Sequence, residues 1–459
     1  MTQTPPYQVT DPATGKTVQA FPHATDAEVE AALSAAAAAF ETWRTRPVAE
    51  RAAIVKRVGA LFSERAAELG ALVTREMGKR PSSARGEAEY CSTIFDYYAD
   101  HGPALLADRA LPGRGGARIE HLPIGPLLGV MPWNYPYSQV ARFVAPNLLA
   151  GNTVVVKHAE NCPTSALAIA DLMRDGGVPD GVYLNVFATH QQVATMIADP
   201  RLRGVSLTGS ERAGAAVAEV AGRQLKKVVL ELGGSDAYIV LDTEDVTAAA
   251  EHAWATRMAN VGQACNSNKR IIVMDDLYDD FVASLVKQAS AMTPRMPGDD
   301  SDESYSPMVS RKAAQTLLDQ VRDAVAKGAT LHVGGELVFE EGAHFAPAVL
   351  TGVTPQMRAY HEELFGPVAV VYPVTSDDEA VALANAVDFG LGGAVWSTDE
   401  HRAAAVAAQL DVGMANVNTS AAEGADVPFG GTKRSGFGRE LGPTGIEEFV
   451  NKRLFYVQR

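Results

Sequence analysis

The stretch PLLGVMPWNYPYSQVARFVAPNLLAGNTVVVK, residues 126–157, contains two short apolar runs separated by a helical segment. The runs at 127–131 and 153–157 have the length and composition of buried strands, and a helix is expected near 137–150. The alternation continues with strands at 182–187, 204–208 and 227–231 and helices near 163–175, 190–198 and 210–222. Such an order predicts a doubly wound parallel sheet and therefore an α/β fold.

Helical and extended segments flank this region. Thr25 and Glu28 form a capping box ahead of an alanine-rich helix at 27–43. Further helical stretches are expected at about 47–78 and 82–100. A turn at 111–116 followed by extended residues 117–122 predicts a hairpin arm, a second αβ series runs from about 237 to 433, and a last extended stretch covers 449–457.

Length and composition indicate a multidomain globular protein. The chain has 459 residues, of which 47% are hydrophobic and 21% charged, and its net charge is −15. This length predicts two or three domains. A nucleic-acid partner would require clustered Lys and Arg, and a membrane helix about 20 unbroken apolar residues, so we expect neither nucleic-acid nor membrane binding.

The three cysteines are too few for a disulfide framework, and none belongs to a metal-spaced pair, so no metal site is expected. Residues 1–7 lack the charged and apolar segments of a secretory signal. A cytoplasmic location is therefore expected. Cys91 and Cys162 are interpreted as small buried hydrophobic residues.

Cys265 differs from the other two cysteines. It lies in a polar Gly-Gln-Ala-Cys-Asn segment at 262–266, where a thiol stays accessible. Glu231 ends a mostly apolar strand and requires a partner or a function, and Asn134 lies on a loop stiffened by two prolines. A thiol, a carboxylate and an amide donor are the groups needed to oxidise an aldehyde through a thioester.

Two segments of the first αβ series suggest a nucleotide site. Lys157 and Glu160 follow a predicted strand, at the sheet edge where ligands bind, and they fit the two hydroxyls of a ribose. A glutamate there also repels a 2′-phosphate, which favours NAD over NADP; a solvated charge pair is the alternative. Residues 208–210, Thr-Gly-Ser, lead into a helix and offer backbone N–H groups to an anion, although a plain strand-to-helix turn explains them equally well.

Seven segments together resemble the aldehyde dehydrogenase family, over essentially the whole chain. They are Pro-Trp-Asn-Tyr-Pro (132–136), Val-Lys-His-Ala-Glu (156–160), Thr-Gly-Ser (208–210), Glu-Leu-Gly-Gly-Ser (231–235), Gly-Gln-Ala-Cys (262–265), Glu-Glu-Leu-Phe-Gly-Pro-Val (362–368) and Pro-Phe-Gly-Gly-Thr-Lys-Arg-Ser-Gly (428–436). Each is a weak signal alone, but their number and order make the resemblance specific.

The resemblance implies a role for each catalytic residue. Cys265 is the nucleophile, and Asn134 forms the oxyanion hole with the backbone N–H of Cys265. Glu231 activates the deacylating water, and a carboxylate at this position favours release of the free acid over transfer to CoA. The implied cofactor is NAD, with NADP possible.

The resemblance also implies the cofactor contacts. Lys157 and Glu160 bind the adenosine ribose, Ser210 the pyrophosphate and Glu363 the nicotinamide ribose, and Phe365 packs beside the nicotinamide. Further residues assigned to the cofactor site are Trp133, Thr208, Gly209 and Gly233.

The domains implied by the resemblance are a nucleotide-binding domain (1–104 and 124–233), a catalytic domain (234–433) and a small β oligomerisation arm (105–123 and 434–459). The arm is expected to extend the sheet of a partner subunit, which implies a homodimer or homotetramer.

For the substrate, the chain looks most similar to the succinate-semialdehyde dehydrogenases. Arg142 lies eight residues, two helical turns, after Asn134, where a guanidinium can hold the distal carboxylate of a semialdehyde. Tyr135 and Tyr137 are the other expected substrate contacts. The alternative for Arg142 is a surface arginine on an exposed helix face.

Two departures keep other substrates open. Those enzymes have a second arginine where this chain has Ala259, with Arg257 nearby, and residues 423–427 introduce Glu and Asp ahead of Pro428. An aromatic or medium-chain aldehyde therefore remains an alternative, with Trp254 and the tyrosines available to line an apolar tunnel. A catalytically inactive binding protein on the same scaffold is a further alternative, against which the intact set of catalytic residues argues.

Overall fold

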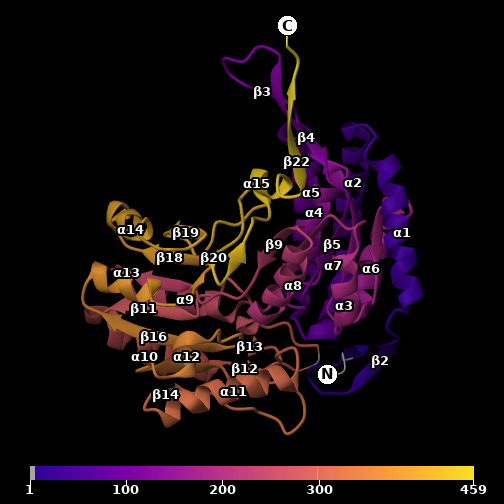
Figure 1. The fold of residues 1–459 in the computed structure, drawn as a ribbon. Helices are drawn as coiled ribbons and strands as arrows, with labels where there is room; N and C mark the ends of the chain where they lie inside the picture. Colours follow the sequence, from indigo (N-terminus) through magenta and orange to yellow (C-terminus); the bar gives the residue numbers. More distant parts are fainter. Residues whose placement is uncertain (1–5, 297, 459) are drawn as a thin grey trace.

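The computed structural model describes residues 6–296 and 298–458. Within this part of the chain two large sheets, both covered by helices, lie next to each other, and a slender arm projects from them (Figure 1). Residues 1–5, on which the expected lack of a signal segment partly rests, lie outside the described residues. None of the described helices has the length and apolar character needed to span a membrane.

The first large sheet has six strands in the order β21-β9-β8-β5-β6-β7. Its strands are β5 (Pro126–Val130), β6 (Thr153–Lys157), β7 (Tyr183–Asn185), β8 (Gly204–Thr208), β9 (Lys227–Glu231) and β21 (Gly436–Phe437). All neighbouring strands are parallel except β21 and β9. Because the strand order reverses between β5 and β8, a ligand crevice is expected at their carboxyl ends.

Helices connect these strands as predicted. They are α5 (Ser138–Ala150), α6 (Pro163–Asp175), α7 (His190–Ala198) and α8 (Glu211–Arg223). The doubly wound α/β prediction is thereby confirmed. Every residue of α5 is buried, because this helix lies between the sheet and a further helical layer.

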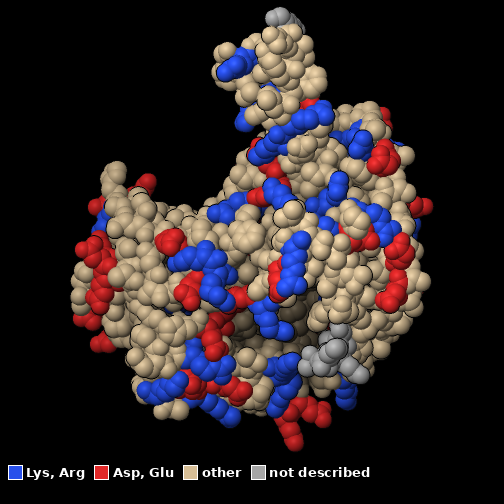
Figure 2. All heavy atoms as spheres, in the orientation of Figure 1, with Lys and Arg blue, Asp and Glu red and all other residues tan. Residues whose placement is uncertain are grey.

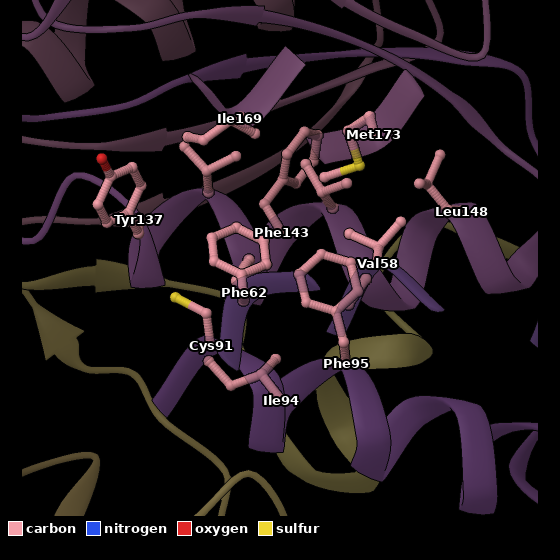
Figure 3. Packing of buried hydrophobic residues seen from close by; sticks show 14 of the residues in the cluster. Val58, Phe62, Cys91, Ile94, Phe95, Tyr137, Phe143, Leu148, Ile169 and Met173 are labelled. Atoms are coloured by element: carbon pink, nitrogen blue, oxygen red, sulfur yellow. The ribbon is translucent and has the colours of Figure 1, made fainter. Parts of the chain in front are cut away.

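That further layer comes from the first hundred residues, where α1 (Asp26–Trp43), α2 (Val48–Glu64), α3 (Ala66–Met77) and α4 (Pro81–Leu105) follow a hairpin of β1 (Tyr7–Thr10) and β2 (Thr17–Phe21). The capping box of α1 is present as predicted. The single helix expected over 47–78 is two helices, because the backbone leaves helical geometry at Arg65 (φ −107°, ψ 15°). Phe62 of α2 stacks on Phe95 of α4, and both belong with Phe143 of α5 to one buried cluster (Figure 3).

The second large sheet has seven strands in the order β14-β15-β16-β11-β10-β18-β19. They are β10 (Ala237–Val240), β11 (Arg270–Met274), β14 (Thr330–Val333), β15 (Ala348–Thr351), β16 (Val368–Val374), β18 (Gly392–Trp396) and β19 (Met414–Val417). Only the β14–β15 pair is antiparallel. The associated helices are α9 (Val246–Met258), α10 (Asp275–Ala291), α11 (Arg311–Ala326), α12 (Arg358–His361), α13 (Asp377–Asn385) and α14 (Glu400–Ala407).

Short elements complete the fold. They are η1 (Ala259–Gly262), β12 (Thr293–Pro294), β13 (Ser304–Tyr305), β17 (Phe389–Gly390), β20 (Thr432–Lys433) and α15 (Gly442–Ile446).

The arm is a three-stranded antiparallel sheet of β3 (Arg109–Ala110), β4 (Ala117–Pro123) and β22 (Val450–Tyr456) that stands away from the body (Figure 1). The predicted hairpin and the final extended stretch are thus neighbours in space. Leu454 and Tyr456 are exposed on β22. Residues 436–437, assigned to the arm in the sequence analysis, form β21 in the first large sheet instead.

Candidate active site

Asn134 and the Cys265 loop are held together by hydrogen bonds. Asn134, on the loop between β5 and α5, donates from Nδ2 to the carbonyl of Gln263 at 3.1 Å. Its Oδ1 accepts from Nε2 of Gln139 at 3.0 Å, and its carbonyl accepts from Nδ2 of Asn260 at 3.1 Å. Because Gln139 occupies the amide oxygen, the amide nitrogen of Asn134 is directed to the Cys265 loop, as an oxyanion donor requires.

The segment before Cys265 has a strained backbone. Asn260, Val261 and Gly262 all have positive φ angles, of 50°, 57° and 70°. A β-branched residue rarely adopts this conformation, and such strain persists only where the surroundings enforce it. A Cβ atom at Gly262 would lie 2.3 Å from the carbonyl oxygen of Gly366, so this position requires glycine.

Arg257 provides much of that enforcement. It is fully buried and donates to the carbonyls of Val368, Leu364 and Gly366 and to the Ser267 hydroxyl. All these partners belong to the protein, so Arg257 fixes the Cys265 loop against the segment that precedes β16. Arg257 therefore does not take the place of the second substrate-binding arginine, which the succinate-semialdehyde dehydrogenases have at the position of Ala259.

Cys265 is partly accessible, whereas Cys91 and Cys162 are buried, which confirms the contrast expected between them. Burial raises the pKa of the Cys265 thiol to about 12, while Arg142 and Lys269 lower it and Glu363 and Glu231 raise it. A reactive thiolate therefore depends on the cations near this loop.

Glu231 ends β9 and is only 2% exposed. Neither of its carboxylate oxygens has a hydrogen-bond partner among the described residues. Burial raises its pKa well above the usual value, the negative charge of Glu440 adds to this effect, and Arg142 opposes it. The backbone at Gly430 approaches this carboxylate closely, since a Cβ there would lie 2.5 Å from Oε1. A buried carboxyl group without a hydrogen-bond partner among the described residues fits a general base that acts on a water.

Glu363 lies between Lys269 and the glycines that follow β9. Its Oε1 is 3.1 Å from Nζ of Lys269 and accepts from the backbone N–H of Gly234 at 3.0 Å. A Cβ at Gly233 would lie 2.6 Å from Glu363 Oε2, so the glycine permits this approach. Phe365, two residues on, meets Trp133 edge-to-face with ring centroids 5.7 Å apart.

The carboxyl edge of the first sheet carries the predicted ribose contacts. Lys157 ends β6, is buried, and donates a hydrogen bond to Glu160. Partial burial works to raise the pKa of Glu160, but the charge and hydrogen bond of Lys157 outweigh it and the pKa is lowered. His190 lies 3.3 Å from the same carboxylate. Because Lys157 is buried, the alternative of a solvated charge pair is wrong for this residue.

Further along the same edge, Thr208 ends β8, which β5 separates from β6, and Ser210 caps α8 by accepting from the N–H of Ala213. Gly209 donates its N–H to the carbonyl of Glu231 at 2.9 Å. The buried hydroxyl of Thr208 has no hydrogen-bond partner among the described residues. An unsatisfied hydroxyl, a helix N-terminus and a buried lysine at one sheet edge fit the phosphates and ribose of a dinucleotide. Figure 2 shows a hollow in the face of the molecule that this view presents.

Arg142 is buried on α5, at 8% exposure, and its Nε lies 3.1 Å from Oε2 of Glu440. Its guanidinium lies over the ring of Phe429, 4.5 Å from the centroid. The alternative of an exposed surface arginine is therefore wrong. Arg142 interacts electrostatically with both Cys265 and Glu231, so its charge belongs to the candidate site.

Tyr137 does not lie where the sequence interpretation expects it. It is fully buried in the helical core, meets Phe62 edge-to-face and donates from its hydroxyl to the carbonyl of Leu69 at 3.0 Å (Figure 3). Its position at the start of α5 turns it towards α2 and α3, so we no longer assign it to the substrate. Tyr135 instead lines a cavity of about 790 Å³ with Trp254 and Ala259.

Three residues of this region were missed in the sequence analysis: Gln139, Lys269 and Glu440. Lys269 comes directly before β11, and Arg270 is the first residue of that strand. Two cations at the start of a buried apolar strand require partners, so the sequence carries a signal for them. Gln139 lies on an all-buried helix beside Asn134, and Glu440 has no sequence signal beyond the similarity of its surroundings.

Comparisons with known proteins agree with this geometry. A model of the aldehyde dehydrogenase family matches residues 1–454. Succinate-semialdehyde dehydrogenase (NADP⁺) of Deinococcus radiodurans is 52% identical over 98% of this chain and 94% of its own length. Succinate-semialdehyde dehydrogenase (NADP⁺) 1 of Mycobacterium tuberculosis is 40% identical over 98% of this chain and 100% of its own.

Among solved structures, succinic semialdehyde dehydrogenase from Streptococcus pyogenes in complex with NADP⁺ superposes with a TM-score of 0.95 at 38% identity, and the match covers 99% of this chain and 100% of the other. The fold, the relatives and the family model agree over nearly the full length. The chain therefore belongs to the aldehyde dehydrogenase family and is an NAD(P)-dependent oxidoreductase that acts on aldehydes.

Proposed function

We propose that the protein oxidises succinate semialdehyde to succinate. Arg142 carries this proposal, because a buried guanidinium that interacts with both Cys265 and Glu231 is suited to a substrate with a second, anionic end. The names of the relatives from Deinococcus radiodurans and Mycobacterium tuberculosis support the same substrate. The neighbouring Glu440 keeps this charge compensated when no substrate carboxylate is bound.

The first half of the reaction belongs to Cys265 and Asn134. The Cys265 thiolate adds to the aldehyde carbon, and the resulting oxyanion is held by Nδ2 of Asn134 and the backbone N–H of Cys265. Gln139 keeps the Asn134 amide in the required orientation. The bound nicotinamide supplies the hydride acceptor for this adduct.

The second half belongs to Glu231. A water gives a proton to the Glu231 carboxylate, and the oxygen of that water attacks the thioester carbon, which releases the acid and restores the Cys265 thiolate. Burial raises the pKa of Glu231, so the carboxylate becomes more abundant as the pH rises, and hydrolysis is expected to accelerate in that direction.

For the cofactor we propose NADP, with NAD as a second acceptor. Lys157, Glu160 and Ser210 hold the dinucleotide on the first sheet, and Glu363 and Phe365 hold it on the second. The argument that Glu160 repels a 2′-phosphate is weakened because Lys157 compensates its charge and His190 lies beside it. The NADP⁺-containing relative from Streptococcus pyogenes supports this choice.

The cavity beside Tyr135 favours a second candidate substrate. Its volume of about 790 Å³ and its lining of Tyr135, Trp254 and Met258 suit an aromatic or medium-chain aldehyde. The small side chain of Ala259 widens this space.

We further propose that the arm mediates a homodimer or homotetramer and that the protein works in the reducing cytoplasm. The exposed Leu454 and Tyr456 on β22 support the first proposal, since an isolated projecting sheet leaves apolar side chains and a strand edge uncovered. An accessible catalytic thiol supports the second.

A panel of aldehydes with NAD and NADP tests the substrate and the cofactor together. We expect the highest kcat/KM for succinate semialdehyde with NADP, and a clearly lower value for hexanal and benzaldehyde. A kcat/KM for hexanal or benzaldehyde that equals or exceeds that for succinate semialdehyde would favour the second candidate, an aromatic or medium-chain aldehyde.

A further inference from the structure

Lys269 is a buried cation attached to the backbone of the nucleophile loop. Its side chain is 1% exposed, and Nζ donates to the carbonyls of Ala264 and Cys265, both at 2.8 Å. Its third contact is Oε1 of Glu363, at 3.1 Å. Lys269 therefore connects the loop that carries the candidate nucleophile to the carboxylate proposed to contact the nicotinamide ribose.

One of these bonds acts on the oxyanion hole. The Ala264 carbonyl belongs to the same peptide group as the N–H of Cys265, which is the backbone donor proposed for the oxyanion. A cation bound to the carbonyl polarises that group and makes its N–H a stronger donor. Lys269 thus strengthens the oxyanion hole without touching the substrate.

The charge of Lys269 also acts on the thiol itself. The ionisable groups that act on Cys265 are Arg142 from α5, Lys269 from the loop, Glu363 ahead of β16, Glu231 at the end of β9 and Tyr135 beside Asn134. The two cations lower the thiol pKa, and the two carboxylates raise it. Arg142 is paired with Glu440, and Lys269 is paired with Glu363 and also feels the negative charge of Asp236.

We propose that Lys269 is a positioning residue that activates the nucleophile, and that Glu363 modulates this activation. While Glu363 is paired with Lys269, its negative charge offsets part of the positive charge that acts on Cys265. When Glu363 binds another partner, the full positive charge of Lys269 acts on the loop. The link to the cofactor rests on the proposed role of Glu363. The effect on the thiol rests on the contacts of Lys269 alone, and it is measurable without cofactor or aldehyde.

The test is the rate of Cys265 alkylation by iodoacetamide, measured against pH on the full-length protein without ligands, with the labelled peptide identified by mass spectrometry. Lys269→Met removes the cation, and we expect its alkylation near neutral pH to be at least tenfold slower, which corresponds to one unit in the thiol pKa. Glu363→Gln removes the opposing charge, and we expect alkylation several times faster than wild type. Lys269→Arg, the matched control, retains the positive charge and should retain most of the rate.

The opposite signs of the two variants separate activation from simple structural support. A purely structural Lys269 would lower the thermal midpoint of the Met variant but leave the pH at half-maximal alkylation unchanged, and that result would overturn the proposal. A change of the alkylation rate in the same direction for Lys269→Met and Glu363→Gln would overturn the proposal as well. If Lys269→Met does not fold, unchanged or slower alkylation of Glu363→Gln still contradicts it. None of these outcomes depends on which aldehyde or dinucleotide the enzyme prefers.

Discussion

The two large sheets contribute to the candidate site from opposite edges. In the first sheet, Lys157, Thr208 and Glu231 are the last residues of β6, β8 and β9. In the second sheet, Cys265 and Glu363 come before β11 and β16, at the amino ends of the strands. The site therefore lies where the carboxyl edge of one parallel sheet meets the amino edge of another.

The two edges are also stabilised differently. The first edge presents a helix N-terminus and an unpartnered Thr208 hydroxyl, groups that are ready to accept a ligand. On the second edge, buried cations bind backbone carbonyls. Arg257 binds those of Leu364, Gly366 and Val368, and Lys269 binds those of Ala264 and Cys265. The comparison indicates that the first edge is built for binding and the second for holding a reactive group in a fixed place.

Replacing the sulfur of Cys265 should have the largest effect, because it should abolish the chemistry of the second edge and leave dinucleotide binding on the first edge intact. In Cys265→Ser the hydroxyl is far less acidic than a thiol, so we expect loss of nearly all dinucleotide reduction with unchanged dinucleotide affinity. Stopped-flow absorbance and a fluorescence titration measure the two quantities. Reduction at the wild-type rate would remove Cys265 from the mechanism.

Asn134→Ala tests whether the first sheet supplies part of the oxyanion hole. Loss of one such donor costs about 3 kcal/mol, so kcat should fall a hundredfold or more while dinucleotide binding persists. Gln139→Leu, which frees the amide without deleting it, should have a smaller effect in the same direction. A kcat unchanged in Asn134→Ala contradicts the assignment.

Arg142→Gln tests whether the positive charge near Cys265 and Glu231 recognises the distal carboxylate of the substrate. We expect KM for succinate semialdehyde to rise at least tenfold, which corresponds to about 1.4 kcal/mol, because the distal carboxylate loses its partner. Arg142→Lys serves as the charge-retaining control, and hexanal as the uncharged substrate. An equal rise of KM for hexanal would show that Arg142 maintains the site and does not recognise the carboxylate.

Tyr137→Phe should have the smallest effect. It removes the hydrogen bond to the Leu69 carbonyl, and the expected loss is about 1 kcal/mol of unfolding free energy. Denaturant unfolding measures this loss, and KM for the aldehyde should stay at the wild-type value. A raised KM with unchanged stability would return Tyr137 to the substrate site.

The first edge was more predictable from the sequence than the second. Strand periodicity located β5, β6, β8 and β9 nearly to the residue, and ligands at the carboxyl ends of parallel strands follow a general rule. No equivalent rule applies to groups that precede strands. Cys265 was singled out by its polar surroundings, and Glu363 acquired a role only through resemblance to a family. The contacts of Lys269 and the Glu440 partner of Arg142 depend on tertiary packing between distant segments, which local patterns do not encode.

The central claim is that a thioester forms on Cys265 and is released by Glu231. Intact and peptide mass spectrometry of Glu231→Gln, incubated with succinate semialdehyde and NADP, tests it most directly. The account predicts a burst of one reduced dinucleotide per subunit without further turnover, and a succinyl group on the peptide that contains Cys265. Continued turnover of this variant at the wild-type rate, or an acyl group on any other residue, would contradict the account.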